Sequence, residues 1–510
     1  MQSEKWIVCV EPNQVTMIDL ANNAQVTRRP IQAEAAIMNP ASAILALRSG
    51  TTLQIFNLEL KSKMKSHQMP EPVVFWRWTS PSNLALITAA AVYHWPISGD
   101  APPTKIFDRH VTLPPNVQII NYQVSPDEKW ALLGGISAGA NGQVNGNMQL
   151  FSVEKNVSQP LQGHAAAFAK VSLSGRDDPA QLLCFHEKKA DAPDHKFYIM
   201  EVGRDPTKGQ PFRMPPTPIP VPADAAADFP VHLNVDSKND IAFLVTKMGY
   251  LYLFDVHTTK PLYRARVTQE TVFVTCNQPS TGAIFGITVR TGQVLRFQLN
   301  GQAIVPYIIS TLRDNDLGIK LAGRLGLPGA ENLYAAEFER LISQRLIADA
   351  ARLVANSGGA LRSPATIHRF QQIPAEPGAP QPVFQYFSIL LEHGKLNEQE
   401  SIELAKPVIQ QGRPQLMEKW LKEDKLTSSE ALGDILVGSD VGMALSVYLR
   451  ANCHAKAINC FVSRGEYDKI VPYASSVGFK MDYSSMLSQL MFSNPQGALD
   501  LAKGLVSAEG

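Results

Sequence analysis

The stretch Leu53-Gln54-Ile55-Phe56-Asn57 contains the pattern that decides the fold of the first part of the chain. Large residues alternate along it and it closes on an aromatic side chain, which is typical of a half-buried β-strand. Similar runs recur along the chain, and the large residues that end them are Ile18, Phe56, Trp95, Phe151, Met200, Phe254 and Phe297. Successive end residues are 38 to 56 positions apart, which is near the length of a four-stranded propeller blade. The seven runs therefore predict an all-β, seven-bladed β-propeller.

Two places in this predicted propeller are irregular. Only four residues precede the first strand-like run, Lys5 to Val10, so the first blade lacks room for an innermost strand and a closing strand. We therefore expect an incomplete first blade or a shortened start. The segment from Asp205 to Pro222 contains seven prolines, and we interpret it as a stiff connection between blades rather than a ligand for a polyproline-binding domain.

The hydrophobic period changes after residue 300. Apolar residues then recur three or four positions apart, as on one face of an amphipathic helix, at Tyr334, Phe338, Leu341 and Ile342 and again at Ile347, Ala350, Ala351 and Val354. Further helical stretches are predicted at Phe384 to His393, Glu398 to Gln411, Gln415 to Glu423, Asp440 to Arg450 and His454 to Phe461. Short helices joined by short connections predict an all-α solenoid, an α-zigzag of antiparallel helices.

Composition and motifs argue against several classes of protein. The 47 Lys and Arg residues balance 46 Asp and Glu residues, so no net field attracts nucleic acid or an anionic membrane. Five scattered cysteines favour a reducing compartment, and no apolar run reaches the roughly 18 residues of a spanning helix. The sequence contains no phosphate-binding loop, GxSxG or HExxH motif, and its histidines are dispersed. We expect no enzyme activity, no metal and no cofactor.

The run that follows Phe56 contains the strongest candidate binding residues. In a regular strand Lys61, Lys63 and Lys65 would lie on one face, about 7 Å apart. One interpretation is a solvated edge strand that its charges protect from aggregation. The other is a groove between neighbouring blades for an extended peptide, in which Gln54 hydrogen-bonds the peptide backbone, Lys61 and Lys63 neutralise its carboxylates, and Arg29 adds a further charge.

Several stretches resemble clathrin heavy chain. They are IMNPAS (Ile37 to Ser42), TLQIFN (Thr52 to Asn57), KSKMK (Lys61 to Lys65), FDRH (Phe107 to His110), QIINY (Gln118 to Tyr122), EKWLKEDKL (Glu418 to Leu426) and ALSVYLRAN (Ala444 to Asn452). They follow the family order through both halves, so the whole chain resembles the N-terminal third or so of the family. The resemblance implies a terminal-domain propeller at 1–299, a helical linker at 300–460 and the start of the helical-repeat leg at 461–510.

The resemblance also implies a function. Family members are structural coat proteins of clathrin-coated pits and vesicles, active in endocytosis and intracellular protein transport, and peripheral on the cytoplasmic face of these membranes. The implied partners are endocytic and trafficking adaptor proteins, which bind the propeller through short linear motifs. Contacts with light chains and other heavy chains are expected only from regions beyond this chain, and neither nucleic acid nor membrane insertion is expected.

Three peptide grooves are implied by the match to the family. The clathrin-box groove between the first two blades takes peptides of the type leucine, apolar, any, apolar, acidic, and the matching residues are Arg29, Leu45, Thr52, Gln54, Phe56, Lys61 and Lys63. A second groove is implied at Gln118, Ile120 and Ile136, and a third at Trp130, Leu150, Lys155 and Gln159. Thr27 stands where the family carries an aliphatic residue, and Lys155 replaces an arginine.

Two other functions remain open. The first is another propeller-plus-solenoid scaffold, such as a different vesicle coat or a tether, in which the propeller contacts protein domains. The absence of WD dipeptides argues against a WD40 version of that scaffold. The second is a propeller enzyme with its active site at the central funnel. We rank the clathrin-type coat first, the other scaffold second and the enzyme last.

Overall fold

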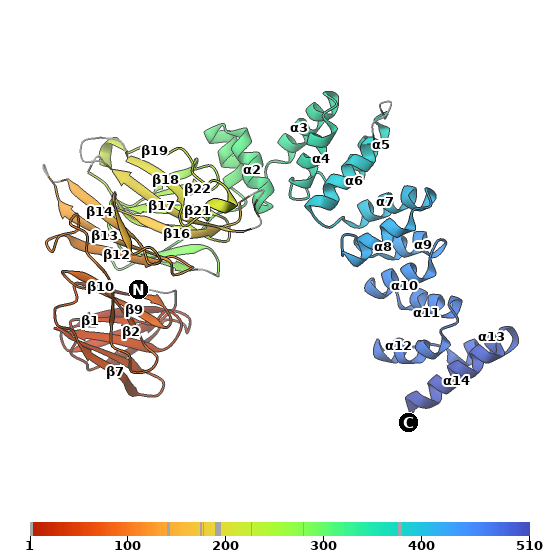
Figure 1. Ribbon diagram of the computed structural model, residues 1–510, viewed down its shortest axis with the longest axis horizontal. Coiled ribbons are helices and arrows are strands. Elements are labelled where there is room, and N and C mark those ends of the chain that lie inside the picture. The colour runs from red at the N-terminus through yellow and green to blue at the C-terminus, as the bar shows by residue number, and fades with distance from the viewer. Residues whose placement is uncertain are drawn as a thin grey trace. The chain divides into compact units, whose positions relative to one another are not determined.

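The computed structural model describes residues 4–509 except 140–142, 174, 175, 177, 189–194, 226, 279 and 376–379. The chain divides into two compact units, Met1–Asn300 and Gly301–Gly510. Strands build the first unit and helices build the second (Figure 1).

The first unit is a propeller whose described residues form seven antiparallel sheets, the blades, each with its strands in chain order. Blade 1 contains β1 (Trp6–Glu11), β2 (Gln14–Asp19) and β3 (Gln25–Arg29), and blade 2 contains β4 (Ala35–Met38), β5 (Ile44–Ser49), β6 (Thr52–Asn57) and β7 (Ser62–Gln68). Blade 3 contains β8 (Phe75–Ser80), β9 (Asn83–Ile87), β10 (Ala91–Pro96) and β11 (Thr104–Asp108), and blade 4 contains β12 (Gln118–Val124), β13 (Trp130–Ala138), β14 (Val144–Ser152) and β15 (Val157–Gln162).

The remaining three blades follow the same plan. Blade 5 contains β16 (Ala166–Val171), β17 (Ala180–Lys188), β18 (His195–Glu201) and β19 (Thr217–Ile219), and blade 6 contains β20 (Pro230–Asp236), β21 (Ile241–Thr246), β22 (Tyr250–Asp255) and β23 (Pro261–Arg266). Blade 7 contains β24 (Val272–Gln278), β25 (Ala283–Thr288) and β26 (Val294–Phe297). The predicted seven-bladed propeller is therefore confirmed.

Each of the seven end residues lies in a different blade. In blades 2 to 7 the end residue lies on the third strand, whereas Ile18 lies on β2, the second strand of blade 1. Because β2 carries the end residue that the third strand carries in the other blades, β1 corresponds to their second strand. A hydrogen bond from Ser280 Oγ to Glu4 Oε2 (3.3 Å) joins the last blade to the segment before β1.

The core of the propeller consists of apolar layers between successive blades. Val15 and Met17 of blade 1, for example, pack with Leu45 and Leu47 of blade 2, and all four are buried. Because both faces of an inner strand meet a neighbouring blade, strands such as β21 are buried along their whole length. Outer strands are half-exposed, so their side chains are the ones available to a ligand.

The proline-rich segment is more regular than we predicted. Within it, β19 pairs with β18 as the fourth strand of blade 5, with Lys196 opposite Pro218. A proline is tolerated there because β19 lies at the edge of its sheet, where one side of the backbone needs no ladder partner. Interpreting the whole segment as a connection was therefore wrong.

The second unit is a run of short helices. They are α1 (Ile304–Tyr307), α2 (Asn315–Leu325), α3 (Glu331–Ser343), α4 (Ile347–Ala355), α5 (Pro364–Gln372), α6 (Pro382–His393), α7 (Glu398–Gln410), α8 (Pro414–Lys422), α9 (Glu430–Val437), α10 (Val441–Arg450), α11 (His454–Ser463), α12 (Ile470–Ser476), α13 (Tyr483–Ser493) and α14 (Pro495–Glu509). One apolar core continues from Phe338 to Leu501, as expected when each helix packs on its neighbours along the chain. The predicted solenoid is confirmed.

Local signals place the ends of these helices. Asn397 and Glu400 form a capping box at the start of α7, in which each side chain accepts a hydrogen bond from the other residue's backbone N–H. The fully buried Glu400 carboxylate also accepts hydrogen bonds from Arg362 Nε (2.9 Å) and the Tyr386 hydroxyl (3.1 Å). This cluster connects the start of α5 with α6 and α7.

Candidate peptide-binding surface

The register of blade 2 brings most of the predicted clathrin-box residues onto one face. Leu45 lies opposite Phe56, and Leu47 lies opposite Gln54. Directly opposed residues in an antiparallel pair point to the same side of the sheet. Leu45 and Leu47 belong to the layer shared with blade 1, and Phe56 packs against it. Thr52, Gln54 and Phe56, which alternate along β6, therefore face blade 1.

A β-bulge in β7 breaks the predicted row of lysines. Lys63 lies opposite Phe56, but the next paired residue is Lys65, opposite Ile55, so Met64 is an extra residue in β7. An extra residue reverses the alternation of side chains. Lys63 therefore shares the face of Phe56, whereas Lys65 points to the other side of the blade. The expectation that the lysines form one row was wrong.

Lys65 contacts blade 3 instead. Its Nζ atom donates hydrogen bonds to the backbone oxygens of Pro96 (2.8 Å) and Ala101 (2.9 Å), and it lies 5.5 Å from the centre of the Trp95 ring. Burial lowers the pKa of Lys65, and the Asp100 carboxylate opposes that shift. This lysine has a structural role between blades 2 and 3.

Lys61 precedes β7 and lies in the turn after β6. The Asn57 side chain accepts hydrogen bonds from the backbone N–H groups of Glu59 and Leu60, both at 3.0 Å, and so holds this turn. Lys61 adopts a left-handed backbone conformation with φ of 52°. The predicted row of lysines required Lys61 to lie in a regular strand. Its exposed side chain instead extends from a turn.

Blade 1 presents Arg29 on the facing side. Arg29 lies opposite Val15 and Thr27 lies opposite Met17, and both partners belong to the layer that packs against blade 2. By the same cross-strand rule, the side chains of Arg29 and Thr27 point toward blade 2. Arg29 is exposed at the end of β3, the outer strand of its blade.

We call the residues whose side chains face the space between these blades the blade 1–2 surface: Arg29, Thr52, Gln54, Phe56 and Lys63, with Leu45 fully buried beneath. It combines a half-buried aromatic ring, an amide and exposed positive charge beside β7, which is an edge strand. Such a surface suits an extended peptide with apolar and acidic side chains. Ser66 and Gln68, which were not predicted, lie opposite Gln54 and Thr52 and so share this face. They are recognisable only once the bulge is known.

The second predicted set lies at the start of blade 4. Gln118 on β12 lies opposite Ile136 on β13, and the register shifts between Ile119 and Asn121, at Ile120. Gln118 is exposed, whereas Ile120 and Ile136 are half-buried. The three residues are therefore neighbours on one pair of strands.

The third predicted set also lies in blade 4. Leu150 on β14 lies opposite Gln159 on β15, and Trp130 packs with Leu150 in the apolar layer between blades 4 and 5. Lys155 is exposed in the turn between β14 and β15, beyond this strand pair. Trp130, Leu150 and Gln159 thus meet on one face, with Lys155 at its end.

The described residues contain no group of three or more His, Cys, Asp or Glu side chains arranged to hold a metal ion. None of the helices in the described part of the chain combines the length and apolar character that crossing a membrane requires.

Comparisons with known proteins agree along the whole chain. Two protein-family models match the helical unit: "Clathrin, heavy-chain linker" at residues 302–324 and "Clathrin-H-link" at residues 326–390. The chain is 46% identical over 513 residues to "Probable clathrin heavy chain 1" of Caenorhabditis elegans, a match that covers 99% of this chain and 30% of the relative. It is 45% identical over 515 residues to human "Clathrin heavy chain 2", which covers 100% of this chain and 31% of that relative. The chain thus spans less than a third of the length of these relatives.

Proposed function

Because the chain belongs to the clathrin heavy chain family and aligns with 30% to 31% of the length of the relatives described, we propose that it serves in a clathrin coat, with its propeller as the part that captures adaptor proteins. In this proposal the coat role is structural and not enzymatic. The protein acts on the cytoplasmic face of coated pits and vesicles during endocytosis and intracellular transport.

The observation that carries the proposed peptide binding is the shared face of Gln54, Phe56 and Lys63, with Arg29 pointing toward it from blade 1. An apolar peptide side chain packs on the Phe56 ring, and Gln54 hydrogen-bonds the peptide backbone. A carboxylate of the peptide pairs with Lys63 or Arg29. This ion pair is weak because both basic side chains are exposed to solvent. Lys61 adds positive charge from the neighbouring turn.

Weak single contacts suit this role. A few peptide residues bury far less surface than a stable protein interface, so each motif binds and leaves quickly. Many propellers on one coat, meeting adaptors with several motifs, supply the overall affinity through effective concentration. The sets at Gln118 and Trp130 are proposed as further, separate peptide sites on the same propeller.

A different propeller-plus-solenoid coat or tether is the second candidate function. It would use the same two-unit plan, with folded domains rather than short peptides as partners. The level of identity to clathrin heavy chains and the match to two clathrin linker families favour the first candidate.

A titration of a labelled clathrin-box peptide against the chain tests the proposal. Fluorescence anisotropy should give saturable binding, and Gln54→Ala should weaken it because the peptide loses a hydrogen bond worth about 1 kcal/mol, or about fivefold in Kd. Lys63→Gln should weaken binding by about two- to fivefold, the usual worth of an exposed charge pair.

Lys65→Gln is the matched control, because it removes the same charge two positions away on the opposite face of the blade. Its affinity for the peptide should equal that of the unchanged chain, with circular dichroism confirming that each variant is folded. A folded chain that fails to bind the peptide, or an equal loss in Lys63→Gln and Lys65→Gln, contradicts the assignment of this surface.

A further inference from the structure

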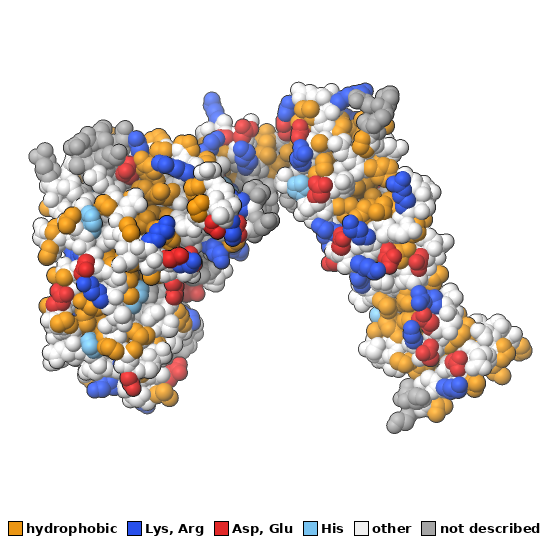
Figure 2. Space-filling model, viewed as in Figure 1, with side chains coloured by type: hydrophobic (Ala, Val, Ile, Leu, Met, Phe, Trp, Pro, Cys, Tyr) orange, Lys and Arg blue, Asp and Glu red, His pale blue; other side chains and the backbone are white. Residues whose placement is uncertain are grey.

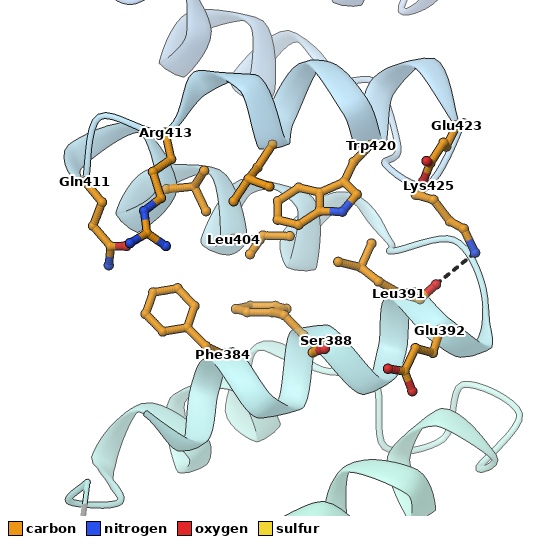
Figure 3. A pocket seen from close by; sticks show the side chains of 13 residues that line it. Phe384, Ser388, Leu391, Glu392, Leu404, Gln411, Arg413, Trp420, Glu423 and Lys425 are labelled. Atoms are coloured by element: carbon orange, nitrogen blue, oxygen red, sulfur yellow. Dashed lines mark hydrogen bonds between the residues drawn. The ribbon is translucent and has the colours of Figure 1, made fainter. Parts of the chain in front are cut away.

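The helical unit contains an open slot of about 480 Å³ between α6, α7 and α8 (Figure 3). Phe387, Leu404 and Val408 form its buried floor. Phe384 and Leu391 on α6 and Trp420 on α8 form its walls, and the indole of Trp420 points into the slot from the side opposite Phe384 and Leu391. Hydrophobic side chains gather over this part of the helical unit in Figure 2.

The apolar walls are incompletely covered. Leu416, which also lines the slot, is 37% exposed, and Phe384, Leu391 and Trp420 are only half-buried. The slot therefore offers a concave apolar surface with polar residues at its rim, into which apolar side chains of another molecule can fit.

The two ends of the slot carry opposite charge (Figure 3). Arg413 and Gln411 lie at one end, and within the described residues the Arg413 guanidinium has no carboxylate or other side-chain partner. Glu392 and Glu423 lie at the other end. Lys425 is also there and remains charged, because its Nζ atom donates a hydrogen bond to a neutral group, the backbone oxygen of Leu391 (2.8 Å), so this end carries one net negative charge. Glu423 already pairs with Lys419 (4.0 Å), which leaves Glu392 as the carboxylate available to a ligand at this end.

The walls favour a helical occupant. The slot is lined by helices, whose backbone groups are already paired, so an extended peptide would find no sheet edge to satisfy its own N–H and C=O groups. A helix satisfies its backbone internally. Phe384 and Glu392 are eight residues apart on α6, which corresponds to about 12 Å, or a little over two helical turns.

We propose that this slot binds an amphipathic helix of another protein, which places apolar side chains at i, i+3 or i+4, and i+7 against Trp420 and Phe387. The charges of the slot set the direction of this helix. An acidic side chain lies beside Arg413, and a basic side chain lies beside Glu392 at the opposite end. This site is separate from the blade 1–2 surface and does not depend on the function proposed for it.

A selection of displayed peptides on the whole chain supplies the probe. The library consists of peptides of about 14 residues with helix-forming outer positions, apolar residues at the i, i+3, i+4 and i+7 positions, and random residues at both ends. Enriched peptides should carry Asp or Glu at one end and Lys or Arg at the other. Their affinity is then measured by fluorescence anisotropy.

Leu416→Glu should weaken an enriched peptide by more than about tenfold, because it places a charge against the apolar face of the bound helix. Leu449→Glu is the matched control, since Leu449 is a similarly exposed leucine, 36%, on α10 and outside the slot. Arg413→Glu should weaken the same peptide by about tenfold, and replacing the acidic end of the peptide by lysine should restore binding to this variant.

Three results overturn the proposal. One is the absence of any enriched peptide, and another is enrichment of peptides that bind Leu416→Glu and Arg413→Glu as well as the unchanged chain. The third is self-association in sedimentation experiments that Leu416→Glu abolishes, because the slot would then hold a second copy of this chain. If Leu416→Glu fails to fold, the Arg413→Glu variant and the charge-swapped peptide still test the proposal, because Arg413 is exposed.

Discussion

His94 lies half-buried on β10, where its Nε2 atom shares a hydrogen bond of 2.7 Å with the Tyr122 hydroxyl of blade 4. Burial lowers the pKa of His94 from 6.5 to about 4. Between these two values the unfolded chain binds a proton that the folded propeller does not bind. The stability of the propeller should therefore fall as the pH decreases through this window, by up to about 1.4 kcal/mol per pH unit from this residue.

Urea unfolding of the chain at several pH values between 7 and 4.5, followed by tryptophan fluorescence, measures this dependence. His94→Gln keeps a hydrogen-bonding side chain but does not titrate, so it should flatten the loss of stability toward acidic pH. If the variant loses stability as steeply as the unchanged chain, the protonation of His94 is not a cause of the loss.

At the same scale, the candidate site was predictable for some residues and not for others. The resemblance to the family grouped Thr52, Gln54 and Phe56, and the register places them on one face, as the period of two along β6 requires. The same rule gave the wrong face for Lys65 and the wrong backbone conformation for Lys61. The cause is one extra residue in β7 and a left-handed turn residue, neither of which can be recognised from the hydrophobic pattern.

Between elements, Gly163, which follows β15 of blade 4, lies close to the backbone of His186 on β17 of blade 5. Its backbone N–H donates a hydrogen bond to Gly146 O (2.9 Å), and a Cβ atom on Gly163 would lie 1.8 Å from His186 O. Its φ of 159° is also rare for residues with a side chain. Gly163→Ala should therefore destabilise the propeller by at least about 3 kcal/mol, because backbone must move to admit the methyl group.

Gly292→Ala is the matched control for this substitution. Gly292 also has a positive φ, 63°, but no atom lies within 4 Å of its missing Cβ, so the expected cost is only the backbone term of about 1 kcal/mol. Denaturant midpoints of the two variants measure the difference. Equal losses would show that the distance between His186 and Gly163 does not limit the packing of these blades.

The elements themselves were predicted unevenly. Helices α3, α4, α6, α7, α8, α10 and α11 were predicted within a few residues, since each has a long apolar stripe. The helices that were not predicted individually are α1, α2, α5, α9, α12, α13 and α14. The proline-rich strand β19 was missed because a pattern of single residues does not reveal that it pairs at the edge of blade 5.

At the scale of the whole molecule, most of the fold was predicted from repeated sequence patterns. Seven end residues at roughly even spacing fix the number of blades, and a helical period that continues for about 200 residues indicates a solenoid. The quoted family stretches were sufficient to identify the clathrin heavy chain family, which the comparisons confirm. The blade 1–2 surface needed the structure, because it combines strands of two sheets whose facing sides depend on register.

The two compact units should unfold as separate cooperative transitions, because the apolar core from Phe338 to Leu501 lies wholly in the second unit and the layers between blades lie wholly in the first. Two substitutions assign the transitions in differential scanning calorimetry. Gly163→Ala should lower only the midpoint of the propeller, and Arg362→Ala should lower only that of the helices, because it leaves the Glu400 carboxylate buried without its ion pair. A single transition that both substitutions lower together would mean that the units fold as one, despite their separate cores.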